Sequence, residues 1–265
     1  MRLDSVLREA RGRRRTIVVP YLMVDRDRRR SLAPTVAALR DGGATALELG
    51  FPFSDPIADG PVLEAAHERA LRDGTRWNDL LAALRVARPI LPTAVMTYAN
   101  PLVHRGLDAA IGDLSAVGAT GLIVPDLSYE EAPPFGRAAR RRGVALVLLA
   151  APGLASERLA RIARASRGFL YLVGHYGTTG GAARGATVDL RPSVATAHGA
   201  APTLPVLIGF GIRDQSTAQR ALAIGADGVV VGSALEEQLR RDPRPGSVTR
   251  FLRAIASART AGPRG

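Results

Sequence analysis

Acidic side chains crowd one short segment, LELGFPFSDPIADGP at residues 47–61. Its first residues read as a buried strand, whose side chains alternate between two faces, so Leu47 and Leu49 share one face and Glu48 points to the other. A carboxyl group removed from water has a raised pKa, and a pKa near neutrality lets it both donate and accept a proton. We therefore expect Glu48 to act as a general acid and base.

A second acid, Asp59, follows beyond a loop that Pro52 and Pro56 stiffen. Pro61 suits the first position of a helix, so Asp59 could instead cap that helix. On the residues alone, both roles of Asp59 stay open. Asp55, in the tripeptide SDP, is interpreted as a structural Asx-turn.

Two glycine turns late in the chain have the composition of phosphate sites, IGFGI at 208–212 and VVVGSALEE at 229–237. Glycine lets the backbone approach an anion closely, and the N–H groups at a helix N-terminus attract negative charge. The residues that these turns offer are Gly209, Gly211, Gly232 and Ser233.

The four histidines show no HxH or HxxxH spacing, which disfavours a metal-dependent aldolase. His67 and His198 are interpreted as ordinary helix or surface residues. His175 lies in the glycine-rich segment 174–187, GHYGTTGGAARGAT, and could reach an active site from there. A segment of this length and composition indicates a functional loop, with a surface insertion as the alternative.

Cysteine and lysine are both absent, so all 36 basic residues are arginine. The first absence excludes disulfides, thiolate nucleophiles and cysteine-ligated metals. The second excludes Schiff-base aldolases, pyridoxal-phosphate enzymes and P-loop NTPases, because each needs a lysine amine.

The formal charge of +12, with the runs RGRRR (11–15) and RDRRR (26–30), raises the possibility of nucleic-acid binding. Aromatic residues make up only 5% of the chain and no nucleic-acid motif is present. The sequence favours solvated arginine faces over a polyanion patch. No apolar run approaches the roughly 18 residues of a membrane helix, and the first residues lack the apolar core of a secretory signal, so we expect a cytoplasmic protein without membrane contact.

Short apolar runs alternate with segments of 3.6-residue apolar spacing. We expect strands at 16–22, 45–50, 92–98, 121–125, 145–150, 169–174, 205–210 and 228–232, and helices at 31–43, 107–118, 129–142, 155–166 and 214–224, with two more near 62–87. This alternation predicts one (β/α)₈ TIM barrel with extra helices, with residues 1–265 as a single domain. An open doubly wound sheet would need a GxGxxG turn after the first strand, where the chain reads MVDRDRRRS.

Together these motifs resemble the tryptophan synthase alpha chain family. The signature at 47–61 is long and family-specific, and the glycine turns are shared with other phosphate-binding barrels. The resemblance covers nearly the whole chain through TYANPL (97–102), IVPDLSYEEA (123–132), YLVGHYGTTG (171–180), IGFGI (208–212) and GADGVVVGSALEE (225–237).

The resemblance implies cleavage of indole-3-glycerol phosphate into indole and glyceraldehyde-3-phosphate without metal or organic cofactor, a step in tryptophan biosynthesis. Glu48 matches the family's acid/base, and Asp59 matches the carboxylate that binds the indole N–H. The matching substrate-binding residues are Tyr21, Met96, Tyr171 and Thr179, and the matching phosphate-binding residues are Gly180, Phe210, Gly211, Gly232 and Ser233. Tyr21 and Met96 could instead be barrel packing.

The chain departs from the family pattern around the mouth of the expected site. The Gly-Asp-Pro turn after the first strand is missing, His175 and Tyr176 stand in an altered loop, and Glu64 replaces a glutamine. The resemblance implies a beta-chain partner in an alpha2beta2 assembly. Three alternatives stay open: a stand-alone or specialised lyase for a modified indole or aryl glycerol phosphate, a low-activity subunit that a beta chain activates, and a catalytically silent phosphate-binding paralog.

Overall fold

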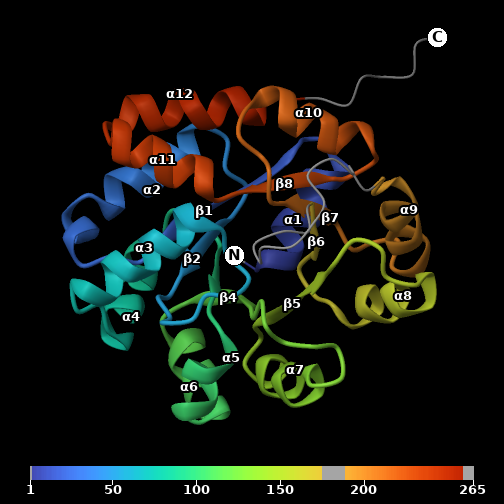
Figure 1. Ribbon diagram of the computed structural model, residues 1–265, viewed down its shortest axis with the longest axis horizontal. Helices are drawn as coiled ribbons and strands as arrows, with labels where there is room; N and C mark the ends of the chain where they lie inside the picture. The colour runs from blue at the N-terminus through green and yellow to red at the C-terminus, as the bar shows by residue number, and fades with distance from the viewer. Residues whose placement is uncertain (1, 175–188, 259–265) are drawn as a thin grey trace.

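Eight parallel strands close into a barrel in the computed structural model, which describes residues 2–174 and 189–258. The strands follow one another around the ring in chain order, and β1 pairs with β8 to close it, with Ile17 opposite Gly228 (Figure 1). Their bounds are β1 Ile17–Met23, β2 Leu47–Gly50, β3 Thr93–Met96, β4 Ala119–Ile123, β5 Ala145–Ala150, β6 Leu170–Val173, β7 Val206–Gly209 and β8 Gly228–Val231. The predicted TIM barrel is confirmed.

Helices surround the barrel, and all of them except α1 and the short η1 form its outer ring (Figure 1). Their bounds are α1 Leu3–Gly12, the 3₁₀ turn η1 Asp27–Arg30, α2 Leu32–Asp41, α3 Pro61–Arg72, α4 Trp77–Ala87, α5 Ala99–His104, α6 Leu107–Ala116, α7 Ala132–Arg141, α8 Ser156–Ala165, α9 Arg191–Ala200, α10 Gln215–Ala223, α11 Ser233–Arg241 and α12 Pro245–Ala256. No helix within the described ranges is long and apolar enough to cross a membrane. That residues 1–265 form one domain stays a prediction.

Two separate apolar clusters follow from the alternation of strand side chains. Leu47 and Leu49 belong to the cluster between strands and helices, whereas Ala46 belongs to the cluster inside the barrel. Glu48 has the parity of Ala46, so its side chain points inward, as the sequence predicts.

The N-terminal helix α1 closes one end of the barrel. Leu3 and Leu7 are fully buried and join the interior cluster, and in Figure 1 α1 lies behind the centre of the ring. A Cβ atom at Gly121 of β4 would lie 2.7 Å from Leu3 Cδ2, and one at Gly168 would lie 2.9 Å from the same atom. Glycine at these two positions makes room for the helix.

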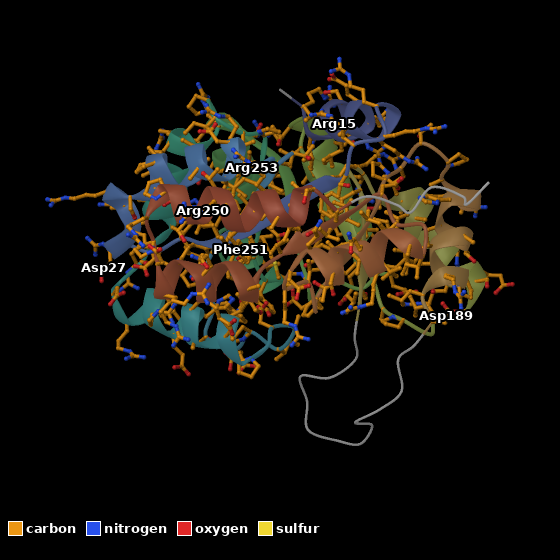
Figure 2. All side chains as sticks on the ribbon, turned by 90° about the horizontal axis from the view of Figure 1, so that it is seen from above. Arg15, Asp27, Asp189, Arg250, Phe251 and Arg253 are labelled. Atoms are coloured by element: carbon orange, nitrogen blue, oxygen red, sulfur yellow. The ribbon has the colours of Figure 1, made fainter. Side chains whose placement is uncertain are left out.

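Arginine side chains project around the whole outline of the molecule (Figure 2). Arg15 lies near α1, and Arg250 and Arg253 lie on α12. Within the run RDRRR, Arg28 and Arg29 make ion pairs with Glu236 and Asp79. The distribution agrees with solvated and structurally paired arginines.

Candidate active site

Glu48 is the second residue of β2, and its side chain has no solvent contact. Within residues 2–174 and 189–258, neither of its carboxyl oxygens has a hydrogen-bond partner. Burial, and then the charge of Asp59, raises the pKa of Glu48 from 4.5 to about 8. At neutral pH the group therefore holds a proton and stands close to the point at which it can release it, which are the properties of a general acid and base.

Asp59 lies at the end of the loop after β2, and its side chain is equally buried. Its Oδ2 accepts hydrogen bonds from Tyr98 Oη at 2.8 Å and from His67 Nε2 at 3.1 Å. Its Oδ1 is buried and has no hydrogen-bond partner among the residues that the structure describes. The helix-cap interpretation of Asp59 is wrong, because Gly60 is the N-cap of α3 and no side chain caps that helix.

The loop that presents Asp59 is held by the same two side chains. The backbone N–H of Phe53 donates to His67 Nδ1 at 3.0 Å, and that of Ala58 donates to Tyr98 Oη at 3.1 Å. The rings of Phe53 and Tyr98 stack with centroids 5.0 Å apart. The proline-stiffened loop thus has an anchor at each end, one on α3 and one at the start of α5.

Two buried phenols line the space next to the carboxyl groups. Tyr21 of β1 and Tyr171 of β6 are 2% and 6% exposed. Burial, followed by Asp59, raises the pKa of Tyr21, and burial, followed by Glu48, raises that of Tyr171. Tyr21 and Tyr171 belong to the apolar cluster inside the barrel, into which Glu48 also points.

Glycines at two strand ends make room for these phenols. A Cβ atom at Gly50 would lie 2.0 Å from Tyr21 Oη, and one at Gly209 would lie 2.2 Å from the ring of Tyr171. Met96 pairs in register with Gly50 and joins the interior cluster, 7% exposed. The rings of the two tyrosines thus reach the last residues of β2 and β7, and Met96 is the last residue of β3.

The turn after β7 has an unusual backbone. Phe210 has φ of 72°, and Gly211 follows with φ of 74°. A non-glycine residue in this left-handed region is strained, and such strain concentrates at functional sites. A Cβ atom at Gly211 would meet nothing within 4 Å, so its surface is open to a ligand.

The turn after β8 leads into α11, which begins at Ser233 with Gly232 as its N-cap. The carbonyl of Gly232 accepts from the N–H groups of Leu235 and Glu236 at 2.9 and 3.1 Å. The N–H groups of Ser233 and Ala234 precede these bonds, at the helix end that attracts anions. Phosphate sites in TIM barrels commonly use a short helix at this position.

The altered turn after β1 is fixed by an ion pair from the opposite end of the chain. Glu236, 2% exposed, accepts from Arg28 Nη1 at 2.8 Å and from the backbone N–H of Met23 at 3.1 Å. Arg29 pairs with Asp79 on α4. These arginines replace the missing Gly-Asp-Pro turn with a side-chain network.

A cavity of about 250 Å³ lies outside the barrel, between the end of β1, η1, α2, α4 and the end of α11. Its wall is largely apolar and includes Leu22, Leu32, Ala83 and Leu239. Neither Glu48 nor Asp59 lines it, so it is separate from the acid pair.

Four residues singled out from the sequence, Thr179, Gly180, His175 and Tyr176, lie outside the described residues. His198 pairs with Asp227 at 2.9 Å, next to the amino end of β8 and away from the acids.

His67 and Tyr98 are the site residues that sequence reasoning missed. The interpretation of His67 as an ordinary helix or surface residue is wrong, because it is 2% exposed and bonded to Asp59. A signal was present: the buried stripe of α3 consists of Leu63, Ala66, His67 and Ala70, so a histidine stands among apolar neighbours. Tyr98 follows β3 within TYANPL, at the strand end where barrels place functional side chains.

A family model described as tryptophan synthase alpha chain matches residues 7–257. The chain belongs to this family. The alpha chain of Synechococcus elongatus is 38% identical over 243 residues, which cover 90% of each chain. That of Gloeobacter violaceus is 37% identical over 262 residues, 97% of this chain and 94% of its own.

Solved structures agree with this membership in the tryptophan synthase alpha chain family. A chain of tryptophan synthase from M. tuberculosis, in its aminoacrylate-bound form, superposes with a TM-score of 0.84 at 32% identity, covering 97% of this chain and 98% of its own. A chain of the tryptophan synthase a2b2 complex from Pyrococcus furiosus has a TM-score of 0.80 at 33% identity, covering 91% and 98%.

Proposed function

We propose that Glu48 and Asp59 are the catalytic pair with which this tryptophan synthase alpha chain cleaves indole-3-glycerol phosphate to indole and glyceraldehyde-3-phosphate. The observation that carries the proposal is a pair of fully buried carboxyl groups in which the charge of Asp59 raises the pKa of Glu48, with three of their four oxygens unpartnered among the described residues. Buried polar atoms in folded proteins are nearly always paired, so these oxygens point to a ligand that supplies the partners.

In the proposed reaction Glu48 first acts as an acid. Its raised pKa keeps it protonated, and it delivers the proton to carbon 3 of the indole ring, which leaves a cationic indolenine. The resulting carboxylate then takes the proton of the glycerol hydroxyl. The carbon–carbon bond breaks, its electrons return to the ring, and indole and the aldehyde separate with Glu48 protonated again.

Asp59 stabilises the intermediate in this scheme. Its free Oδ1 accepts the indole N–H, whose acidity rises as the ring becomes cationic. Because the site excludes water, the attraction between a fixed carboxylate and a developing positive charge is large. The flanking Tyr21, Met96 and Tyr171 bound the ring of the substrate.

The phosphate group is assigned to the open turn at Phe210–Gly211 and the start of α11 at Gly232–Ser233. Both turns follow neighbouring strands, β7 and β8, which pair in register. Backbone N–H groups there would hold the phosphate and fix the distance between the anion and the acids. Thr179 and Gly180 stay predicted substrate contacts.

We also infer that the chain works in the cytoplasm, where its phosphorylated substrate would be made, and that a beta chain is its partner. The comparison that supports the partner is the a2b2 assembly of the Pyrococcus furiosus enzyme. The altered turn after β1, fixed by Arg28 and Glu236, is the feature that keeps a stand-alone lyase as the second candidate.

The test is release of indole from indole-3-glycerol phosphate by the purified chain, with and without an added beta chain. We expect indole in both cases, faster with the beta chain, and co-elution of the two chains. Indole release at full rate alone, without co-elution, would support the stand-alone enzyme. No indole under either condition would overturn the proposed function.

A further inference from the structure

His67 uses both ring nitrogens inside the protein. Nδ1 lies 3.0 Å from the backbone nitrogen of Phe53, and Nε2 lies 3.1 Å from Asp59 Oδ2. A backbone N–H can only donate, so Nδ1 must offer its lone pair. The ring proton therefore sits on Nε2, and the hydrogen bond to Asp59 runs from His67 to the carboxylate.

We propose that His67 is a positioning residue for Asp59, which holds Oδ2 so that Oδ1 faces the indole N–H of the substrate. The proposal rests on the proposed function and adds to it a residue that the sequence pattern did not indicate. His67 does not touch the substrate in this arrangement. It acts through Asp59 alone.

The geometry explains how one oxygen is kept free. Tyr98 Oη and His67 Nε2 both donate to Oδ2, the first from the N-cap of α5 and the second from α3. With both donors on the same oxygen, the rotation of the carboxylate is fixed, and Oδ1 has no partner in the part of the chain that the structure describes. Fixing a charged group before the reaction removes the cost of reorienting it in the transition state.

The choice of histidine over a cation has an electrostatic reason. A neutral imidazole donates a hydrogen bond without cancelling the negative charge of Asp59, whereas a guanidinium would pair with it and compete with the cationic ring. The chain carries 36 basic residues, all arginine, yet among the described residues the side chains that donate to Asp59 are a phenol and an imidazole. The site thus keeps its full anionic charge for the substrate.

His67 also joins the two ends of the catalytic loop. Phe53 lies near its start and Asp59 at its end, and one ring bonds to both. Because the ring is part of the buried stripe of α3, it cannot move without disturbing Leu63 and Ala66. A shift of the loop would therefore move the carboxylate and the helix together.

Two variants separate the proposed role from packing. His67→Phe keeps the ring volume and removes both bonds, and His67→Gln keeps a donor near the place of Nε2. We expect His67→Phe to lower kcat on the order of 100-fold with KM nearly unchanged, because misplacing a group by about 1 Å has that effect and the phosphate contacts lie elsewhere. We expect the kcat of His67→Gln to be at least tenfold higher than that of His67→Phe.

The decisive comparison repeats His67→Phe in an Asp59→Asn background. If His67 acts through Asp59, adding His67→Phe to the Asp59→Asn enzyme causes no further loss of kcat. The same fold-loss in both backgrounds, or a folded His67→Phe enzyme with kcat within twofold of wild type, would overturn the proposal. His198→Phe is the matched control, because His198 also pairs with an aspartate, Asp227, at 2.9 Å; we expect it to change Tm and leave kcat unaltered.

A measurement on the unaltered enzyme covers the case in which His67→Phe fails to fold. Nitrogen NMR of the His67 ring at pH 7 should show a protonated Nε2 and an unprotonated Nδ1. The opposite tautomer would overturn the proposal. A wild-type enzyme that releases no indole would instead refute the proposed function, so the two failures are distinguishable.

Discussion

Glu48 combines two properties that an ordinary core residue does not: it is ionisable, and it is buried without a hydrogen-bond partner in the described ranges 2–174 and 189–258. Its raised pKa means that the native state binds its proton more tightly than the unfolded chain does. Between pH 4.5 and about 8 the native protein therefore holds more protons, so its free energy of unfolding falls as the pH rises. Above about pH 8 both states have released the proton of Glu48, and the free energy of unfolding falls no further on its account.

This linkage predicts that Glu48→Gln stabilises the protein at alkaline pH. The gain should be on the order of 5 kcal/mol above pH 8 and should vanish below pH 4.5, because the variant has no proton to lose. Urea denaturation of both proteins across this range measures it. Equal stability of the two at pH 9 would show that Glu48 is not held protonated by its surroundings.

At the scale of the elements, local sequence patterns predicted the strands, whereas helices that depend on distant contacts were missed. The strands expected at 145–150 and 228–232 agree closely with β5 and β8, because apolar runs bounded by turns are local signals. The short helix α5 and the N-terminal helix α1 were not predicted. The first has few residues for a pattern to form, and the role of α1 as a plug depends on Gly121 and Gly168, far along the chain.

The site shows the same division. The inward direction of Glu48 follows from the alternation of strand side chains. Ala46, which has the same parity, belongs to the cluster inside the barrel and confirms this direction. The Asp59–His67–Tyr98 contacts join a loop, α3 and the start of α5, and no sequence period specifies them. The Arg28–Glu236 pair likewise joins residues 208 positions apart.

The outer cavity gives a prediction about α4. Ala83→Leu should fill part of the 250 Å³ space and raise the free energy of unfolding by about 1 kcal/mol, with kcat unchanged. Ala65→Leu, the same change at an exposed helical position, is the control and should have little effect. If denaturation shows that Ala83→Leu lowers the free energy of unfolding while Ala65→Leu does not, the cavity has no room for the larger side chain and the prediction is wrong.

At the scale of the whole molecule, the barrel brings together groups that the chain separates widely. The acids come from β2 and the loop after it, the phenols from β1 and β6, and the turns assigned to phosphate from the ends of β7 and β8. Asp59 and the two turns lie beyond the carboxyl ends of strands, on the face where TIM barrels carry their active sites. Glu48, Tyr21 and Tyr171 point from within their strands into the barrel interior. Side chains with nitrogen at their tips project around the outline of the molecule in Figure 2.

The turnover of acid variants tests the central claim most directly. Indole release should be measured for Glu48→Gln and Asp59→Asn beside two controls on exposed acids, Glu68→Gln on α3 and Asp55→Asn in the same loop. We predict that both site variants lose kcat by at least about 1,000-fold while they stay folded, and that both controls keep wild-type kcat. A folded Glu48→Gln enzyme that releases indole at the wild-type rate would contradict the account.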